Sequence, residues 1–155
     1  MVRSVIVGVI GAGCASEAGY AAAREVGRLL AGRGATLVCG GLGGVMEAAC
    51  RGCSEAGGMA VGLLPGATAE SANPWVGLPI VTNMGHARNV IIAQTAQVLI
   101  AVEGEYGTLS EIAVALKLGK PVISLQSWPE VPGIVPADSP EQAVAAAFSL
   151  LEQKR

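Results

Sequence analysis

The sequence contains few aromatic residues and little charge, and each shortage excludes a class of function. Aromatic residues make up 3% of the 155 residues, too few for the stacking platforms that bind single-stranded nucleic acid. Ten basic residues stand against 12 acidic ones, giving a net charge of −2. This balance excludes a basic nucleic-acid-binding coat and an acidic disordered tail. We therefore expect no nucleic-acid partner.

Long hydrophobic runs are also missing. The longest apolar-looking stretch, residues 90–102, is interrupted by Gln94, Thr95 and Gln97, whereas a membrane-spanning helix needs ~20 apolar residues. Residues 1–8 lack the longer apolar core and the cleavage site of a signal peptide. We expect a cytoplasmic protein that does not contact a membrane.

Histidine is almost absent, which limits metal chemistry. One histidine and four cysteines are present, and a tetrahedral zinc site at Cys50-x-x-Cys53 would need two further ligands. This pair falls inside an expected helix rather than at its start, unlike a thioredoxin-type pair. We expect no metal site and interpret the cysteines as small core residues, with the roles of Cys14 and Cys39 left open.

Apolar residues and glycine are abundant instead. Hydrophobic residues make up 52% of the chain and charged residues 14%, which favours a folded core. So little charge leaves apolar surface to be buried between subunits, so we expect a homo-oligomer, a dimer or a tetramer. The length fits one domain over residues 1–155. The 22 glycines, about twice the average usage, indicate tight turns.

Short β-branched runs alternate with helical patterns along the chain. This alternation predicts a single Rossmann-like, doubly wound α/β domain, with a mostly parallel sheet and helices on both faces. The strands are continuously apolar, as expected when both faces are covered. Ligands bind such sheets beyond the carboxyl ends of the strands. The loops expected there are residues 11–16, 40–44, 82–88 and 103–108. Predicted strands cover 4–10, 35–39, 59–64, 98–102 and 122–125; predicted helices cover 17–31, 45–56, 87–97 and 109–118, with a last helix opening at Ser139.

The first two of these loops are rich in glycine. Gly11-x-Gly13-x-x-Ser16 approaches the dinucleotide fingerprint, but a serine replaces the third glycine and no acid follows the second strand. A nicotinamide site is thus disfavoured, and a phosphate site and a plain turn remain equally open for this loop. In the second loop, four glycines in five positions favour a phosphate or sugar cradle over a plain turn. They are Gly40, Gly41, Gly43 and Gly44.

Two further stretches carry chemistry or helix caps. Thr108 and Glu111 have capping-box spacing, which predicts Thr108 as a helix N-cap. Alternatively, this helix start binds an anion, and Glu111 orients a water or stabilises an oxocarbenium ion. Arg88 is expected in the first turn of a helix, where it opposes the dipole unless an anionic ligand or Glu111 lies nearby. We interpret His86 as a cap or a packed side chain.

Four stretches of the sequence are similar to those of a known family. The chain resembles the LOG-like proteins, once labelled lysine decarboxylase-like, in four stretches: GGLGGVM at 40–46, MGHARN at 84–89, EGEYGTLSE at 103–111 and LGKPV at 118–122. The resemblance implies a Rossmann-like fold and homo-oligomers. LOG enzymes cleave the N-glycosidic bond of nucleoside 5′-monophosphates. By this resemblance Glu111 falls on their catalytic glutamate, Arg88 on their active-site arginine, and Gly104, Gly107 and Thr108 on their phosphate loop.

Departures from the LOG enzymes favour a different branch. The enzymes have Arg-Lys where this chain has Arg88-Asn89, and Pro-Gly-Gly where it has 103–105, Glu-Gly-Glu. The Gly-His-Ala-Arg-Asn form resembles a short branch that includes molybdenum cofactor carrier proteins. Our first hypothesis is therefore a carrier for a phosphorylated, nucleotide-like cofactor, such as the molybdenum cofactor or a nucleoside monophosphate, with Arg88 as counter-charge. The remaining expected binding residues are Gly11, Gly13, Ser16, Gly40, Gly41, Gly43, Gly44, Gly104, Gly107 and Thr108.

Two alternatives stay open. One is a LOG-type phosphoribohydrolase with Glu111 and Arg88 as catalytic residues. The other is an interaction protein with a vestigial site, because caps would account for Thr108 and Glu111. We expect no pyridoxal phosphate, since the sequence makes no case for its Schiff base.

Overall fold

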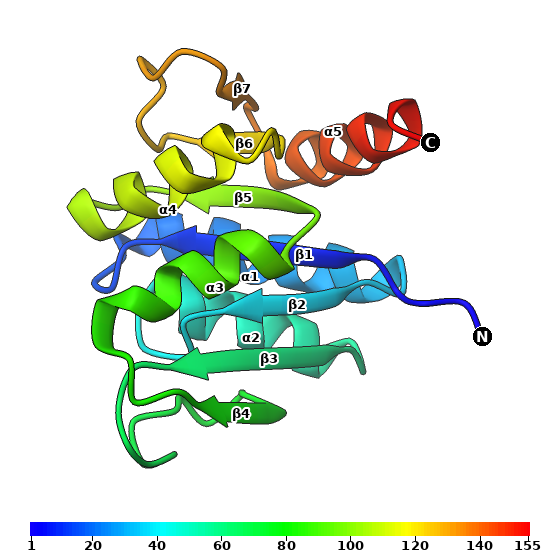
Figure 1. Cartoon of the computed structure of the whole chain (residues 1–155). Helices are drawn as coiled ribbons and strands as arrows, with labels where there is room; N and C mark the ends of the chain where they lie inside the picture. The colour runs from blue at the N-terminus through cyan, green and yellow to red at the C-terminus, as the bar shows by residue number, and fades with distance from the viewer.

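The computed structural model describes all 155 residues and forms one seven-stranded sheet with five α-helices (Figure 1). The strand order is β4-β3-β2-β1-β5-β6-β7, and every neighbouring pair is parallel. The predicted Rossmann-like α/β fold is confirmed, and the sheet is wholly rather than mostly parallel. The elements are β1 (Ile6–Gly11), α1 (Glu17–Gly32), β2 (Thr36–Cys39), α2 (Val45–Glu55), β3 (Met59–Leu64), β4 (Leu78–Val81), the 3₁₀ turn η1 (Gly85–Ala87), α3 (Arg88–Thr95), β5 (Val98–Val102), α4 (Tyr106–Lys117), β6 (Val122–Leu125), β7 (Val135–Pro136) and α5 (Pro140–Gln153).

Helices cover both faces of the sheet. Helices α1, α2 and α5 enclose a core of 22 buried residues on one face, and α3 and α4 enclose a core of 11 on the other (Figure 1). Strand β5 shows how one strand feeds both: Val98, Ile100 and Val102 point into the larger core, and Leu99 and Ala101 into the smaller. Because successive side chains alternate between faces, a strand covered on both sides must be apolar throughout.

Helices α1 and α2 approach each other very closely through glycine. A Cβ on Gly27 would lie 2.0 Å from the carbonyl oxygen of Ala49, and a Cβ on Gly52 would lie 1.8 Å from that of Arg24. No side chain fits at either position, so these two glycines permit the helix contact. Cys50 and Cys53, on the same helix, are buried in the larger core, as expected for small core residues.

Several element boundaries follow local chemistry that is visible in the sequence. Ser16 caps α1 by accepting a hydrogen bond from the amide of Gly19 at 3.0 Å. Ser139 caps α5 in the same way through Gln142, with Pro140 at the first helical position. The short β7 lies between β6 and α5, in a segment for which the sequence predicted neither a strand nor a helix. Its two residues are too few to produce a strand pattern, and pairing with β6 alone defines them.

The order of the strands determines where a ligand site can lie. From β1 the chain passes to β2 on one side, and after β4 it crosses to β5 on the other side of β1. The loops that follow β1 and β5 therefore diverge, which opens a crevice at the carboxyl ends of these strands. None of the helices combines the length and the apolar character that a membrane span requires.

Candidate functional site

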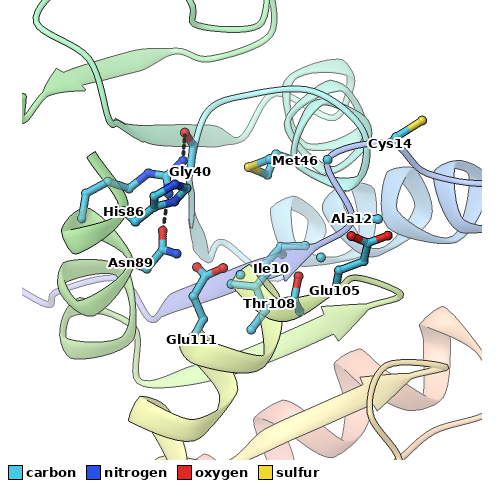
Figure 2. Close-up of a pocket in the computed structure, with 15 residues that line it drawn as sticks. Ile10, Ala12, Cys14, Gly40, Met46, His86, Asn89, Glu105, Thr108 and Glu111 are labelled. Carbon is cyan, nitrogen blue, oxygen red and sulfur yellow. Dashed lines mark hydrogen bonds between the residues drawn. The ribbon is translucent and has the colours of Figure 1, made fainter. Parts of the chain in front are cut away.

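A cavity of about 400 Å³ lies in this crevice, within the ~300–1,000 Å³ range of small-molecule sites. Each of the four predicted loops contributes to its lining. Loop 11–16 contributes residues 11–14, and loop 40–44 contributes Gly40. Loop 82–88 contributes His86 and Arg88, and loop 103–108 contributes Glu105, Gly107 and Thr108. Figure 2 shows Asn89 and Glu111 on one side of the cavity and Ala12 and Glu105 on the other, with Thr108 between them. The sequence thus predicted the place of the cavity correctly.

The expected binding residues, together with the catalytic candidate Glu111, divide into two groups. The cavity lining includes seven of them: Gly11, Gly13, Gly40, Arg88, Gly107, Thr108 and Glu111. Five others are outside the lining: Ser16, Gly41, Gly43, Gly44 and Gly104. The fold itself accounts for four of the five, since Ser16 caps α1 and Gly41, Gly44 and Gly104 adopt positive φ.

The N-terminus of α1 is already occupied by a carboxylate of the protein. Glu103 accepts a hydrogen bond from the amide of Ser16 at 3.1 Å and another from the Ser16 hydroxyl. Gly19 makes room for it, since a Cβ there would lie 2.3 Å from the Glu103 carboxylate. Glu103 comes from the end of β5, so this contact depends on the tertiary fold. The carboxylate fills the position in which the sequence suggested a ligand phosphate next to Ser16.

The second glycine loop is held in place by hydrogen bonds to residues of the protein outside it. The amide of Gly41 donates to the Cys39 sulfur at 3.3 Å, and the Asn73 side chain donates to the carbonyl of Leu42 at 2.9 Å. Only Gly40 reaches the cavity, where a Cβ would lie 2.7 Å from the terminal nitrogen of Arg88. Gly40 thus makes room for an arginine beside the cavity, and the phosphate or sugar cradle expected at this loop stays a prediction.

The start of α4 differs from the predicted capping box. The N-cap is Glu105, it makes no side-chain capping bond, and Thr108 is the third helical residue. The chain turns earlier than expected because Glu103 and Gly104 both adopt positive φ, +54° and +104°. The indole of Trp128 then donates to the Glu105 carbonyl at 3.2 Å. The prediction of Thr108 as a cap is therefore wrong, and the first amides of α4 have no side-chain cap.

Thr108 and Glu111 thereby lose the structural explanation that the sequence offered. Thr108 is 4% exposed and Glu111 is 9% exposed, both line the cavity, and neither side chain has a hydrogen-bond partner in the protein. Burial raises the pKa of Glu111 to about 7, and the nearby Arg88 guanidinium opposes part of that rise. No buried side-chain nitrogen or oxygen atom of the structure lacks a partner, so the polar atoms of these two residues open onto the cavity, where a ligand can contact them.

Arg88 is fixed by the protein rather than by Glu111. It begins α3, and its guanidinium donates to the carbonyl of Leu63 at 2.8 Å, to the carbonyl of Gly40 at 3.4 Å and to the side-chain oxygen of Asn89. Dashed lines in Figure 2 mark the bonds to Gly40 and Asn89. Burial lowers its pKa from the ordinary value, while Glu111 counteracts this change. Since arginine stays protonated in proteins, a buried cation of fixed position adjoins the cavity.

Four lining side chains went unnoticed or were interpreted differently from sequence. Asn89 is 8% exposed and lines the cavity. In the sequence it was noted only as the position at which the LOG enzymes have a lysine. Met46 lines it from the first turn of α2. His86 is exposed at the cavity rather than packed, and Cys14 is exposed there rather than in the core. No side-chain group of three or more histidine, cysteine or acidic residues is arranged to hold a metal ion.

Fold and cavity together define a LOG-like, Rossmann-type protein with a cavity at the topological switch point of its sheet. The chain belongs to the SLOG cluster4 family, whose model matches residues 4–152. A relative from Archaeoglobus fulgidus is 48% identical over 143 residues, which cover 92% of this chain and 94% of the relative.

Solved structures extend this comparison. The molybdenum cofactor binding protein from Rippkaea orientalis is 35% identical, with a TM-score of 0.92 over 97% of this chain and 99% of that one. The molybdenum cofactor carrier protein from Chlamydomonas reinhardtii is 37% identical, with a TM-score of 0.89 over the same shares. The short branch suggested by the residues around His86 is thus the branch to which this chain is similar.

Proposed function

We propose that this protein binds and carries a phosphorylated, nucleotide-like cofactor of the molybdenum cofactor type. The observation that carries the proposal is the cavity beside an uncapped helix start, with Thr108 buried there and lacking a partner. The likeness to two molybdenum cofactor proteins over 97% of the chain supports the choice of cargo.

The phosphate would lie at the N-terminus of α4. Amide groups of its first turn have no side-chain cap, and the Thr108 hydroxyl is free to donate. Gly107 adds no side chain, so a phosphate can approach the backbone. Helix N-termini bind anions through such N–H groups together with the helix dipole, so this end of the cavity suits a phosphate. Gly11 and Gly13 line the cavity from the facing β1–α1 loop.

Arg88 would supply charge without taking the phosphate directly. Its guanidinium is held by two backbone carbonyls and Asn89, so it can attract an anion into the cavity while remaining in position. Because water screens a buried charge only weakly, the guanidinium attracts an anion over several ångströms. The chain would therefore hold its cargo through hydrogen bonds at one end of the cavity and charge at the other.

A titration with a phosphorylated pterin tests this proposal. The pterin ring is fluorescent, so the dissociation constant can be followed directly for the wild type, Thr108→Val and Ser110→Ala. Thr108→Val removes a hydrogen bond to a charged group, worth about 1.5–3 kcal/mol, so its affinity should fall by roughly 10–100-fold. Ser110 is the control, because its hydroxyl is exposed on the same helix and bonded to the Gly107 carbonyl. Equal affinities in all three proteins would refute the phosphate position.

Phosphoribohydrolase activity is a second candidate, favoured by one observation. Glu111 has a pKa of about 7 in a cavity that also holds a buried arginine, which suits a general acid or base near neutral pH. Chromatography of the protein incubated with nucleoside 5′-monophosphates tests it. Free base from the wild type but not from Glu111→Gln would establish turnover. If the wild type releases no base from any nucleotide, the hydrolase function is refuted and only the carrier function remains.

We also propose that the chain assembles into a dimer or tetramer through its edge strand β4. Leu78, Ile80 and Val81 are all exposed on this strand, and an unpaired apolar edge is a ready surface for association. Light scattering should give the mass of an oligomer for the wild type. The mass should fall to that of the monomer for Ile80→Lys, and a monomeric wild type would contradict this assembly.

A further inference from the structure

The carboxyl of Glu111 and the amide of Asn89 form a second recognition point in the cavity, at the end away from the α4 N-terminus. Both residues line the cavity, at 9% and 8% exposure, and come from different helices, α4 and α3. Figure 2 shows their side chains on the same side of the cavity. The NH₂ group of Asn89 and the carboxyl of Glu111 have no hydrogen-bond partner in the protein.

Arg88 determines which end of the Asn89 amide is free. Its guanidinium donates to the side-chain oxygen of Asn89, and a guanidinium has only donors. If the Asn89 amide were flipped, its NH₂ group would face the N–H groups of Arg88, so this orientation is excluded. The oxygen is engaged, and the NH₂ group is left to face a ligand. Arg88 is here a positioning residue for Asn89.

Glu111 provides the complementary group. An ionised carboxyl only accepts hydrogen bonds, and its two oxygens match two adjacent N–H donors. The cavity end thus offers one donor, from Asn89, beside a two-oxygen acceptor, from Glu111. Ile10 and Met46 line the same cavity with apolar atoms, and a flexible methionine adapts well to a flat ring.

We infer that Asn89 and Glu111 recognise the 2-amino-4-oxopyrimidine edge of a bound ring, the edge that pterins and guanine share. Its oxo group accepts from the Asn89 amide, and its ring N–H and amino group donate to Glu111. Adenine presents the opposite pattern, a donor where the oxo group stands and an acceptor where the ring N–H stands. Glu111 and Asn89 therefore select the class of ring. This inference rests on the proposed function, because the phosphate at α4 holds the ring in reach.

Three nucleotides that differ only in this edge test the inference. Dissociation constants are measured by titration calorimetry for GMP, IMP and AMP, which share the ribose and the phosphate; IMP lacks only the amino group. GMP should bind about 10–100-fold more tightly than AMP, with IMP between them, since each lost hydrogen bond to a charged group weakens binding by about tenfold or more. A phosphorylated pterin should compete with GMP for the same site.

Variants separate the roles of the two residues. Glu111→Gln replaces one acceptor by a donor and should remove most of the preference for GMP over AMP. Asn89→Asp retains an oxygen for Arg88 but replaces the free NH₂ by oxygen, and should weaken GMP more than AMP. Glu70→Gln is the matched control, because Glu70 is exposed in a loop outside the cavity lining, and its ratio should equal that of the wild type.

Failure of this inference is distinguishable from failure of the proposed function. If GMP, IMP and AMP bind equally, and Thr108→Val weakens all three, the phosphate site stands and the recognition by Asn89 and Glu111 is overturned. If the preference for GMP survives in Glu111→Gln, the inference is overturned as well. If neither the nucleotides nor the phosphorylated pterin binds the wild type, the proposed function fails and this inference fails with it.

Discussion

Replacing Glu111 by glutamine should make the protein more resistant to unfolding at alkaline pH. The pKa of this carboxyl is about 7 in the folded chain, against an ordinary value of 4.5, because burial disfavours its charge. Between these values the folded state binds more protons than the unfolded state, so the free energy of unfolding falls as the pH rises. The stability is fully present below about pH 4.5 and is lost as the pH rises through 7.

The size of the effect follows from the two pKa values. At about 1.4 kcal/mol per pH unit, ionisation of Glu111 costs about 3 kcal/mol in total. Most of this, about 2–3 kcal/mol, develops between pH 5 and pH 9. Glutamine has nearly the same shape and no charge, so Glu111→Gln should not pay this cost. For a chain of this length the difference corresponds to a rise in Tm of roughly 5–10 °C at pH 9 relative to pH 5.

Urea unfolding of the wild type and of Glu111→Gln at pH 5, 6, 7, 8 and 9 measures this effect. The difference between the two proteins cancels the titration of all other groups, and Glu70→Gln provides the control for a lost exposed carboxylate. The free-energy difference should grow by about 2–3 kcal/mol from pH 5 to pH 9. A difference that stays constant over this range would show that Glu111 is ionised in an environment as polar as water, and would refute the account of its burial.

Three further substitutions test the site. Gly40→Ala should push the Arg88 guanidinium from its place, since the new Cβ would lie 2.7 Å from its terminal nitrogen; pterin affinity should fall about tenfold. Gly32→Ala, at the end of α1 and outside the cavity lining, places its Cβ with no atom within 4 Å and should bind normally. Arg88→Ala should raise the pKa of Glu111 further, because it removes the cation that lowers it, and NMR titration of the Glu111 carboxyl would reveal an unchanged pKa if this is wrong. Ser16→Ala should cost about 1 kcal/mol of stability in urea unfolding without weakening pterin binding, and a large loss of affinity would return Ser16 to the phosphate site.

The fold and the position of the cavity could be predicted because their signals are local. Apolar strands alternate with helices, and glycine turns mark the strand ends where a doubly wound sheet binds ligands. Ser16 and Ser139 function as caps within three residues of their own position, so short-range chemistry identifies them. Strand β5 is apolar throughout because both of its faces are buried.

The roles of individual site residues were harder to predict because they depend on contacts between distant segments. Glu103 occupies the α1 N-terminus 87 residues away in the chain, and no spacing rule reports such a contact. The start of α4 is set by two positive φ angles and by Trp128 from beyond β6, so the capping-box pattern of Thr108 and Glu111 was misleading. Asn89 appeared only as the loss of a lysine, because its value lies in the orientation that Arg88 gives it.

Binding of the molybdenum cofactor itself tests the central claim most directly. Cofactor released from a donor enzyme under anaerobic conditions is equilibrated with the wild type and with Thr108→Val, and protein-bound molybdenum and pterin are measured after dialysis. The account predicts equimolar molybdenum, pterin and chain for the wild type, and a loss of roughly 10–100-fold in affinity for Thr108→Val. A wild type that retains neither molybdenum nor pterin would contradict the proposal that this cavity carries the cofactor.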